Sequence, residues 1–86
     1  MLYRIFIVDD NAAVRTGIRK LLQTSGFEIC GEAFDGLDAV EQAPEISPDL
    51  IILDVSMPRL NGLDAARKLR DIHPNVPILL LSLIHI

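Results

Sequence analysis

Three carboxylates stand directly after short apolar runs in this chain. Residues 5–8 (Ile-Phe-Ile-Val) lead into Asp9 and Asp10, and residues 50–53 (Leu-Ile-Ile-Leu) lead into Asp54. Continuous apolar runs of this length, bounded by turn residues, are typical of strands buried on both faces of a parallel sheet. Ligands of such sheets bind beyond the carboxyl ends of the strands. We therefore expect the three aspartates to meet at one edge of the sheet, around a shared pocket.

Carboxylates that lie this close repel one another in a partly dry pocket, so either some of them bind protons or a cation joins them. A ligand set made only of oxygen atoms suits Mg²⁺ or Mn²⁺, and the backbone carbonyl of Ser56 can complete it. A bound cation offsets the charge of a phosphoryl group, and a carboxylate can be the nucleophile that accepts this group. The alternative is that each aspartate only forms a turn or caps a helix, which explains one such residue more easily than three.

The elements that must position these carboxylates alternate regularly along the chain. A helix is predicted between Asn11, a good N-cap, and Gly26, which is placed for a left-handed C-terminal cap. Pro44 is expected to end or distort a second, shorter helix. The predicted strands are residues 5–8, 27–33, 50–53 and 78–82, and the predicted second and third helices are residues 37–43 and 63–73.

This alternation of strands and helices predicts a three-layer α/β fold. Short connections and right-handed crossovers require a parallel sheet with helices on both of its faces. The helices should turn their apolar residues toward the sheet at a spacing of three or four. The expected apolar faces are Val14, Ile18, Leu21 and Leu22 in the first helix and Leu63, Ala66, Leu69 and Ile72 in the third.

The composition argues against several classes of protein. The net charge of −4, from 8 basic and 12 acidic residues, argues against general binding to nucleic acid, which requires clustered Lys and Arg. No apolar run approaches the ~18 residues of a membrane span, so we expect no membrane segment. Cys30 is the single cysteine and cannot form an internal disulfide, which favours a reducing, cytoplasmic setting.

The acidic pair after the first strand, together with Asp-x-x-Met-Pro-x-x-Asn-Gly after the third, resembles the receiver domain of bacterial two-component response regulators. The resemblance runs from Arg4 to about Leu83 and includes Ser82. It implies a flavodoxin-like (CheY-like) fold with strand order 2-1-3-4 in this chain. It also implies a signalling domain, not an enzyme, that accepts a phosphoryl group from the phosphohistidine of a sensor histidine kinase. The attached effector would be a DNA-binding domain of the helix-turn-helix class.

The resemblance also assigns a role to each residue of the motifs. Asp54 would be the phospho-acceptor, and the hydroxyl of Ser82 would contact the phosphoryl group as the switch residue. The remaining roles are metal binding by Asp9, Asp10, Asp54 and the Ser56 carbonyl, with Mg²⁺ or Mn²⁺ as the ion, and loop shaping by Met57, Pro58 and Gly62.

The chain departs from the family in its length. Residues 1–86 match a single, incomplete receiver domain, without the fourth helix, the fifth strand with its lysine, or the fifth helix of the family. The strand at residues 78–86 then becomes an edge that is almost entirely apolar. Apolar edges of this kind pair with other chains, so we expect self-association through it.

Two other functions compete with a signalling receiver. The first is an aspartate-nucleophile phosphatase of the haloacid dehalogenase type, which also uses a strand-end aspartate and Mg²⁺. That class usually has Asp-x-Asp on its first strand, whereas the acids here are adjacent. The second is an inactive receiver fragment that folds only by self-association. Labelling with a phosphoryl donor that disappears in Asp54→Asn favours the receiver over the inert fragment.

Overall fold

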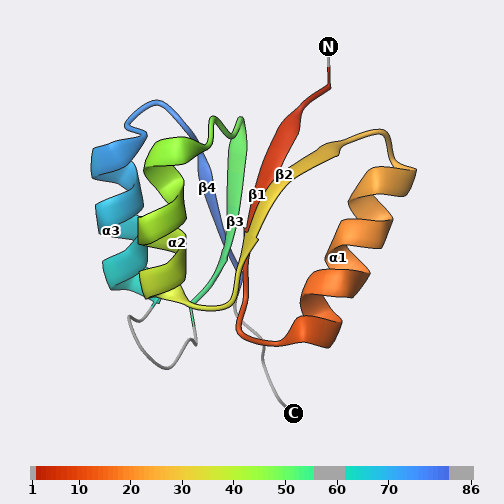
Figure 1. The fold of residues 1–86 in the computed structure, drawn as a ribbon, viewed down its shortest axis with the longest axis horizontal. Helices are drawn as coiled ribbons and strands as arrows, with labels where there is room; N and C mark the ends of the chain where they lie inside the picture. The colour runs from red at the N-terminus through yellow and green to blue at the C-terminus, as the bar shows by residue number, and fades with distance from the viewer. Residues whose placement is uncertain (1, 56–61, 82–86) are drawn as a thin grey trace.

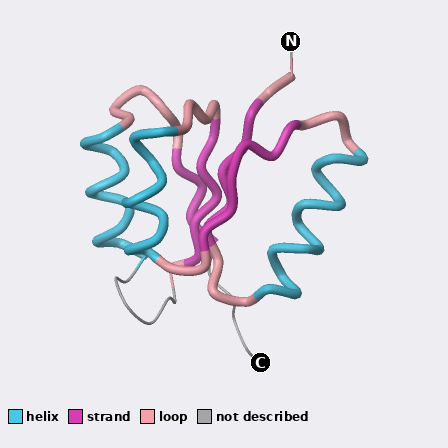
Figure 2. The backbone as a smooth tube through the Cα atoms, in the orientation of Figure 1, coloured by secondary structure: helices cyan, strands magenta, loops and turns pink. Residues whose placement is uncertain are grey.

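The computed structural model describes residues 2–55 and 62–81 as a parallel sheet between two layers of helices (Figure 1; Figure 2). Its strands lie in the order β2-β1-β3-β4. Both the strand order and the alternation of strands with helices are as predicted. The strands are β1 (Arg4–Val8), β2 (Glu28–Ala33), β3 (Leu50–Asp54) and β4 (Ile78–Leu81); the helices are α1 (Ala12–Thr24), α2 (Gly36–Gln42) and α3 (Gly62–Ile72).

The two interior strands, β1 and β3, contain the apolar runs that the sequence singled out. Residues 5–8 and 51–54 are all buried, which confirms that both strands are covered on both faces. The pairing is parallel, with Phe6 opposite Ile51 and Val8 opposite Leu53. The carboxyl ends of β1 and β3 therefore meet at the same edge of the sheet.

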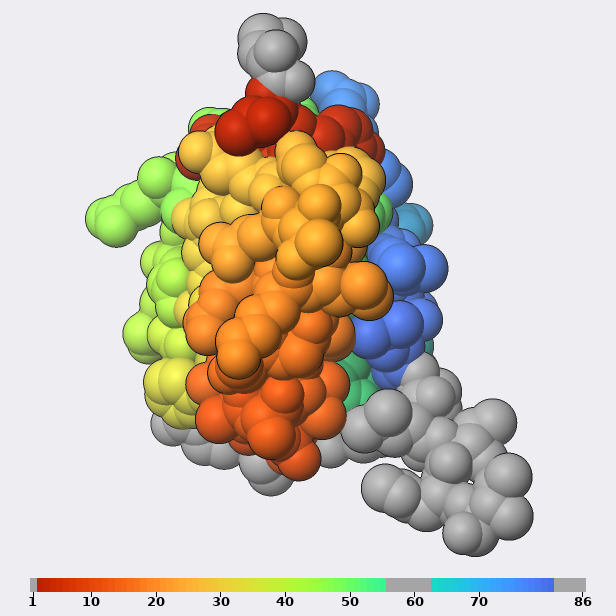
Figure 3. Space-filling view, turned by 90° about the vertical axis from the view of Figure 1, so that its right-hand side faces the viewer, coloured from red at the N-terminus to blue at the C-terminus, as the bar shows by residue number. Residues whose placement is uncertain are grey.

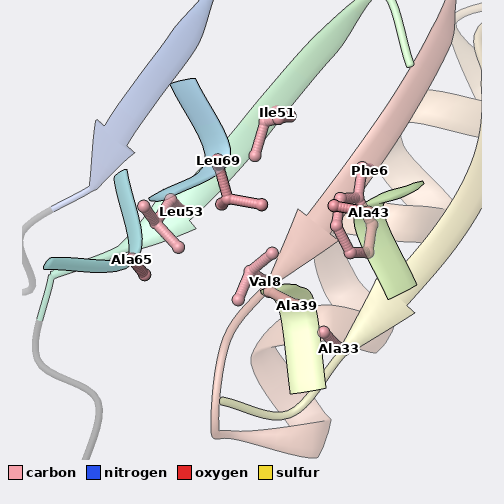
Figure 4. Packing of buried hydrophobic residues seen from close by; sticks show 9 residues of the cluster. All are labelled: Phe6, Val8, Ala33, Ala39, Ala43, Ile51, Leu53, Ala65 and Leu69. Carbon is pink, nitrogen blue, oxygen red and sulfur yellow. The ribbon is translucent and has the colours of Figure 1, made fainter. Parts of the chain in front are cut away.

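Helices α2 and α3 cover one face of the sheet with a dense apolar core (Figure 4). The helices contribute small side chains, which allow them to approach the sheet and each other closely. Gly31 on β2 lies against the Phe6 ring, where an added Cβ would be 3.2 Å from Phe6 Cδ1. The buried residues of this core, which we call the α2–α3 core, are Phe6, Val8, Ala33, Ala39, Ala43, Ile51, Leu53, Ala65 and Leu69.

Within the described part of the chain, α1 is the helix that covers the opposite face (Figure 1). Ile5, Ile7 and Ile52 are the fully buried members of this smaller cluster, which we call the α1 core. No residue of α1 itself is buried. Figure 3 shows α1 across the middle of this face, with the blue end of the described chain uncovered beside it. Half-buried residues complete the α1 core: Ile18, Leu22, Ile29, Leu50 and Leu81.

Two of the predicted core positions are wrong. Leu21 on α1 is 68% exposed, and Leu63 on α3 is 59% exposed. In α3, Ala65 is fully buried and Leu69 packs beside it. A period of 3.6 residues gives the direction of a helix face but not its width. Each helix buries only the part of its surface that meets the sheet or a neighbouring helix, so leucines outside that part remain in solvent.

The helix ends follow the predicted signals. The Asn11 side chain accepts hydrogen bonds from the N–H groups of Ala13 (2.9 Å) and Val14 (3.1 Å), which caps α1. Gly26 follows α1 with a φ of 93°, the left-handed conformation that glycine adopts most easily. Pro44 ends α2 and lies in a 3₁₀ turn, Ala43–Glu45.

The far end of α3 is tied to this turn. The Nε2 atom of His73 lies 2.6 Å from the carbonyl oxygen of Ala43. Because the carbonyl can only accept, the imidazole donates from Nε2 in this contact. The bond joins the C-terminal ends of α2 and α3 at the edge of the sheet opposite the aspartates.

Several predicted residues lie outside the described part of the chain: Ser56, Met57, Pro58 and residues 82–86, with Ser82 among them. Gly62 is the first residue of α3. In the described residues, β4 ends at Leu81, and its Leu79 and Leu80 are 50% and 43% exposed. No described helix is long and apolar enough to cross a membrane.

Candidate functional site

The three aspartates converge at the carboxyl edge of the sheet. Because Val8 pairs with Leu53, the next residues of the two strands, Asp9 and Asp54, come to lie side by side. One carboxylate oxygen from each of Asp9, Asp10 and Asp54 lies within 4.8 Å of the others. Asp9 and Asp54 are both only 2% exposed, whereas Asp10 is exposed. The convergence expected from the sequence is therefore present.

Asp9 is fixed at three points. Its N–H donates to the Ala33 carbonyl of β2 at 3.1 Å, which extends the parallel ladder by one residue. Its Oδ1 accepts from the Asn11 N–H at 2.8 Å. Its own carbonyl accepts from the guanidinium of Arg15 at 2.7 Å. The main chain and the carboxylate of Asp9 are thus both held at the mouth of the site.

The three carboxylates of the site repel one another. Burial raises the pKa of the Asp9 carboxyl, and the neighbouring carboxylates of Asp54 and Asp10 raise it further. The Asn11 N–H and the Arg15 guanidinium oppose this rise in pKa without cancelling it. A cation between the carboxylates would remove the repulsion, so the site favours binding a positive ion.

The three carboxylates fit a small divalent cation. Their donor set is oxygen only, as Mg²⁺ and Mn²⁺ prefer. An octahedral Mg²⁺ places its ligand oxygens about 3 to 4 Å apart, a spacing close to that of this cluster. Within residues 2–55 and 62–81, this is the one group of three or more acidic, His or Cys side chains close enough to share an ion.

One contact of the site was missed in the sequence. Arg15 is absent from the predicted site residues, yet it reaches Asp9 and also pairs with Glu32 of β2 at 3.5 Å. A signal for this contact was present. Side chains in a helix point back toward its N-terminus, and Arg15 lies only one turn beyond the Asn11 cap.

A further buried carboxylate, Asp35, has a structural role. It caps α2 by accepting from the Asp38 N–H at 2.8 Å, while Asp38 accepts from the Phe34 N–H at 3.2 Å. This arrangement resembles a capping box, except that the acid at the third helical residue accepts from the N–H of the residue before the cap. Asp35 thus marks the start of α2.

The family of this chain is shown by comparison with known sequences. The response regulator receiver domain family matches residues 5–85. The chain therefore belongs to the response regulator receiver domain family, in agreement with the resemblance noted from its motifs.

Curated relatives extend this result. The chain is 39% identical over 79 residues to the chemotaxis protein CheY of Thermotoga maritima, covering 92% of this chain and 66% of that protein. It is 41% identical over 80 residues to a protein-glutamate methylesterase/protein-glutamine glutaminase of Pyrococcus abyssi, covering 92% of this chain and 22% of that enzyme. The chain thus spans just under two thirds of the first relative and a small part of the second.

Solved structures show the same fold. The response regulator domain of Thermotoga maritima CheB is 32% identical, with a TM-score of 0.87 over 95% of this chain and 61% of that one. Vibrio cholerae CheY4 is 30% identical, with a TM-score of 0.89 over 100% of this chain and 72% of that one. The predicted CheY-like architecture is confirmed.

Proposed function

We propose that this chain accepts a phosphoryl group on Asp54, as the receiver of a two-component response regulator. The observation that carries the proposal is the meeting of Asp9, Asp10 and Asp54 at the ends of neighbouring strands, with their oxygens within 4.8 Å. Membership of the receiver family supports this function over the phosphatase alternative. The receiver itself acts as a signalling domain and not as an enzyme.

The proposed reaction uses Asp54 as the nucleophile. One carboxylate oxygen of Asp54 forms a bond to phosphorus while the bond from phosphorus to the imidazole nitrogen of a phosphohistidine breaks. The imidazole leaves, and Asp54 becomes an acyl phosphate. The burial of Asp54 should limit the access of water to this product.

Mg²⁺ is the proposed cofactor, with Mn²⁺ as a substitute. When bound, it supplies positive charge to the oxygens of the transferred group. Asp9, Asp10 and Asp54 would hold it, together with the backbone carbonyl of Ser56. A related structure supports this: Thermotoga maritima TrrA, 34% identical with a TM-score of 0.87 over 94% of this chain and 70% of that one, was solved in complex with Mg²⁺-BeF.

The remaining site residues keep their predicted roles as proposals. The hydroxyl of Ser82 would bind an oxygen of the phosphoryl group. Met57 and Pro58 would shape the loop between β3 and α3, which Gly62 closes by starting the helix.

The proposed donor is a sensor histidine kinase in the cytoplasm. A DNA-binding effector is the proposed output, supported by a LuxR-family response regulator from Aurantimonas that is 30% identical, with a TM-score of 0.89 over 99% of this chain and 61% of that one. The relatives also include chemotaxis proteins, so the effector is tested by reading the gene beyond the codon for Ile86. A reading frame without a helix-turn-helix domain would contradict this output.

The experiment that tests phosphoryl acceptance is labelling with phosphoramidate in the presence of Mg²⁺. We expect the wild type to gain one phosphoryl group by intact mass spectrometry, and chelation of Mg²⁺ to prevent it. Asp54→Asn should remove the label. Asp35→Asn is the matched control, because Asp35 is a buried aspartate outside the cluster, and this variant should keep the label.

Two results would contradict the proposal. A label that persists in Asp54→Asn would move the acceptor to another residue. A folded wild type without any label would support the second candidate, an inactive fragment that self-associates. The exposed Leu79 and Leu80 on β4 favour self-association through this strand. Light scattering that shows a folded monomer at high concentration would refute it.

A further inference from the structure

We infer that Arg15 is a positioning residue of the metal site, which holds the main chain of the acidic pair against the end of β2. The inference rests on the proposed function, since it concerns the same three carboxylates. Arg15 is not one of the carboxylate ligands itself. It acts through Asp9, whose carbonyl it contacts at 2.7 Å.

Arg15 connects the site to the neighbouring strand with a single guanidinium group. One terminal nitrogen donates to the Asp9 carbonyl, and Nε lies 3.5 Å from a carboxylate oxygen of Glu32. The side chains of Arg15 and Glu32 are 20% and 25% exposed, against 40% and 48% for the surface pair of Arg4 and Glu28. The Arg15 contacts are therefore better shielded from water than an ordinary surface ion pair.

Glu32, the other anchor of Arg15, is itself fixed from both sides of the sheet. Its carboxylate accepts from Arg19 of α1 at 2.7 Å. Its backbone carbonyl accepts from the side-chain amide of Gln42 of α2 at 3.0 Å. The point to which Arg15 ties Asp9 therefore belongs to a network that includes α1, β2 and α2.

The hydrogen bond from Arg15 to the Asp9 carbonyl also affects the orientation of Asp10. The Asp9 N–H is already bonded to Ala33, so the hydrogen bond from Arg15 to the Asp9 carbonyl fixes the peptide that joins Asp9 to Asp10. Asp10 is exposed and starts from this peptide. Groups that orient the ligands of a metal contribute strongly to its affinity.

The direction in which Mg²⁺ affinity changes on removal of Arg15 distinguishes a positioning role from an effect of its charge. By Coulomb's law, removing a positive residue next to three carboxylates should strengthen the binding of a cation. If Arg15 acts by positioning, its removal should instead weaken binding, because the acidic pair is no longer held. Weaker binding in Arg15→Ala is thus a result that loss of charge does not produce.

Arg19 provides a matched control. It lies on the same helix one turn further on, carries the same charge and binds the same Glu32, but its hydrogen bond runs to Glu32 rather than to Asp9. Arg19→Ala should therefore weaken the Glu32 anchor but leave the hydrogen bond from Arg15 to the Asp9 carbonyl in place. Arg15→Lys keeps the charge but loses the planar fork of donors.

The experiment measures the dissociation constant for Mg²⁺ by calorimetry in the wild type, Arg15→Ala, Arg15→Lys and Arg19→Ala, with urea unfolding to compare stability. We expect Arg15→Ala to weaken Mg²⁺ binding about tenfold. Arg15→Lys should show a smaller loss, and Arg19→Ala, which loosens only the Glu32 anchor, should lose much less affinity than Arg15→Ala. Should Arg15→Ala fail to fold, the comparison of Arg15→Lys with the wild type decides.

Three outcomes would count against the inference. Equal Mg²⁺ affinity in Arg15→Ala and Arg19→Ala would overturn it while leaving the proposed metal site in place. Tighter binding in Arg15→Ala would show that Arg15 acts through its charge alone, which also overturns it. A folded wild type that binds no Mg²⁺ would overturn the proposed metal site and the inference together.

Discussion

The two faces of the sheet are built differently. The face under α2 and α3 is closed by nine buried apolar residues drawn from strands and helices. The face under α1 has three, all from the strands, and α1 contributes only half-buried side chains. In their place, α1 is attached by polar contacts, through Arg15 and Arg19 to Glu32 and through Arg15 to Asp9.

This difference shows how the chain separates stability from function. Apolar packing on the α2–α3 side fixes the strands, whose ends in turn place the aspartates. The α1 side carries the polar groups that touch the site, and it should open more easily because it buries fewer apolar side chains. The two faces should therefore respond differently to mutation, pH and alkylation.

Truncation of a core leucine should have very different costs on the two faces. Leu69→Ala removes a fully buried side chain from α3 and should cost about 3 to 5 kcal/mol of unfolding free energy. Leu22→Ala removes a half-buried side chain from α1 and should cost about 1 to 2 kcal/mol. Both are leucines in helices, so helix propensity cancels in the comparison. Urea unfolding measures both, and equal losses would contradict the contrast between the faces.

Loss of a helix cap should also cost more unfolding free energy on the α2–α3 side than on the α1 side, with smaller losses on both. Asp35→Ala removes the buried cap of α2 and should cost about 2 kcal/mol, the upper end for such caps. Asn11→Ala removes the exposed cap of α1 and should cost about 1 kcal/mol. Asn11→Ser retains a cap and serves as the control. A larger loss for Asn11→Ala, in the same urea titration, would reverse the expected ranking.

The unfolding free energy should depend on pH through the titration of Asp9, on the α1 side. Its pKa is raised above the ordinary value of 3.8, so the folded state binds this proton more tightly than the unfolded state does. The resulting stabilisation is present at low pH and is lost as the pH rises from the unfolded pKa through the folded pKa. We expect the unfolding free energy of metal-free protein to fall over this window.

Asp9→Asn isolates this contribution. The variant should be more stable than the wild type at neutral pH without metal, and the difference between the two should vanish at low pH. Urea titrations at several pH values with a chelator present measure both curves, and hydrogen exchange of the α1 amides reports the local effect. A constant difference at all pH values would show that Asp9 does not titrate in this way.

The smallest effect concerns Cys30. It is half-buried on β2 against the α2–α3 core, and burial raises the pKa of its thiol. Since the thiolate is the reactive form, alkylation by iodoacetamide should be slower in the folded protein than in urea. Leu69→Ala, which loosens that core, should speed the reaction more than Leu22→Ala does. The opposite order, by mass spectrometry over time, would place Cys30 with the α1 side.

Much of the fold could be predicted because the local signals agree with one another. Residues 5–8 and 50–53 are apolar without interruption, and Asn11, Gly26 and Pro44 mark helix ends by well-understood chemistry. The convergence of the aspartates followed from strand order alone. Their separate chemical roles are not decided by position, and they stay predictions for the phosphorylation and metal-binding experiments.

The misses have a common physical cause. Leu21 and Leu63 lie outside the covered faces of α1 and α3, and which part of each helix is covered depends on neighbours that one helix pattern does not describe. The contact of Arg15 with Asp9 depends likewise on the angle at which α1 leaves the sheet. Periodicity predicts which residues share a face, whereas contacts across elements require the tertiary arrangement.

The hydrogen bond between His73 and Ala43 has a consequence for motion. It connects the C-terminal ends of α2 and α3, at the end of the sheet opposite Asp54. The N-terminal ends of both helices lie at the end of the sheet that carries the aspartates. If phosphorylation of Asp54 displaces the start of α3, the two helices should therefore rotate together about this hydrogen bond. Sliding of α3 alone would first have to break it. Replacement of His73 removes this hydrogen bond and should let α3 move independently of α2.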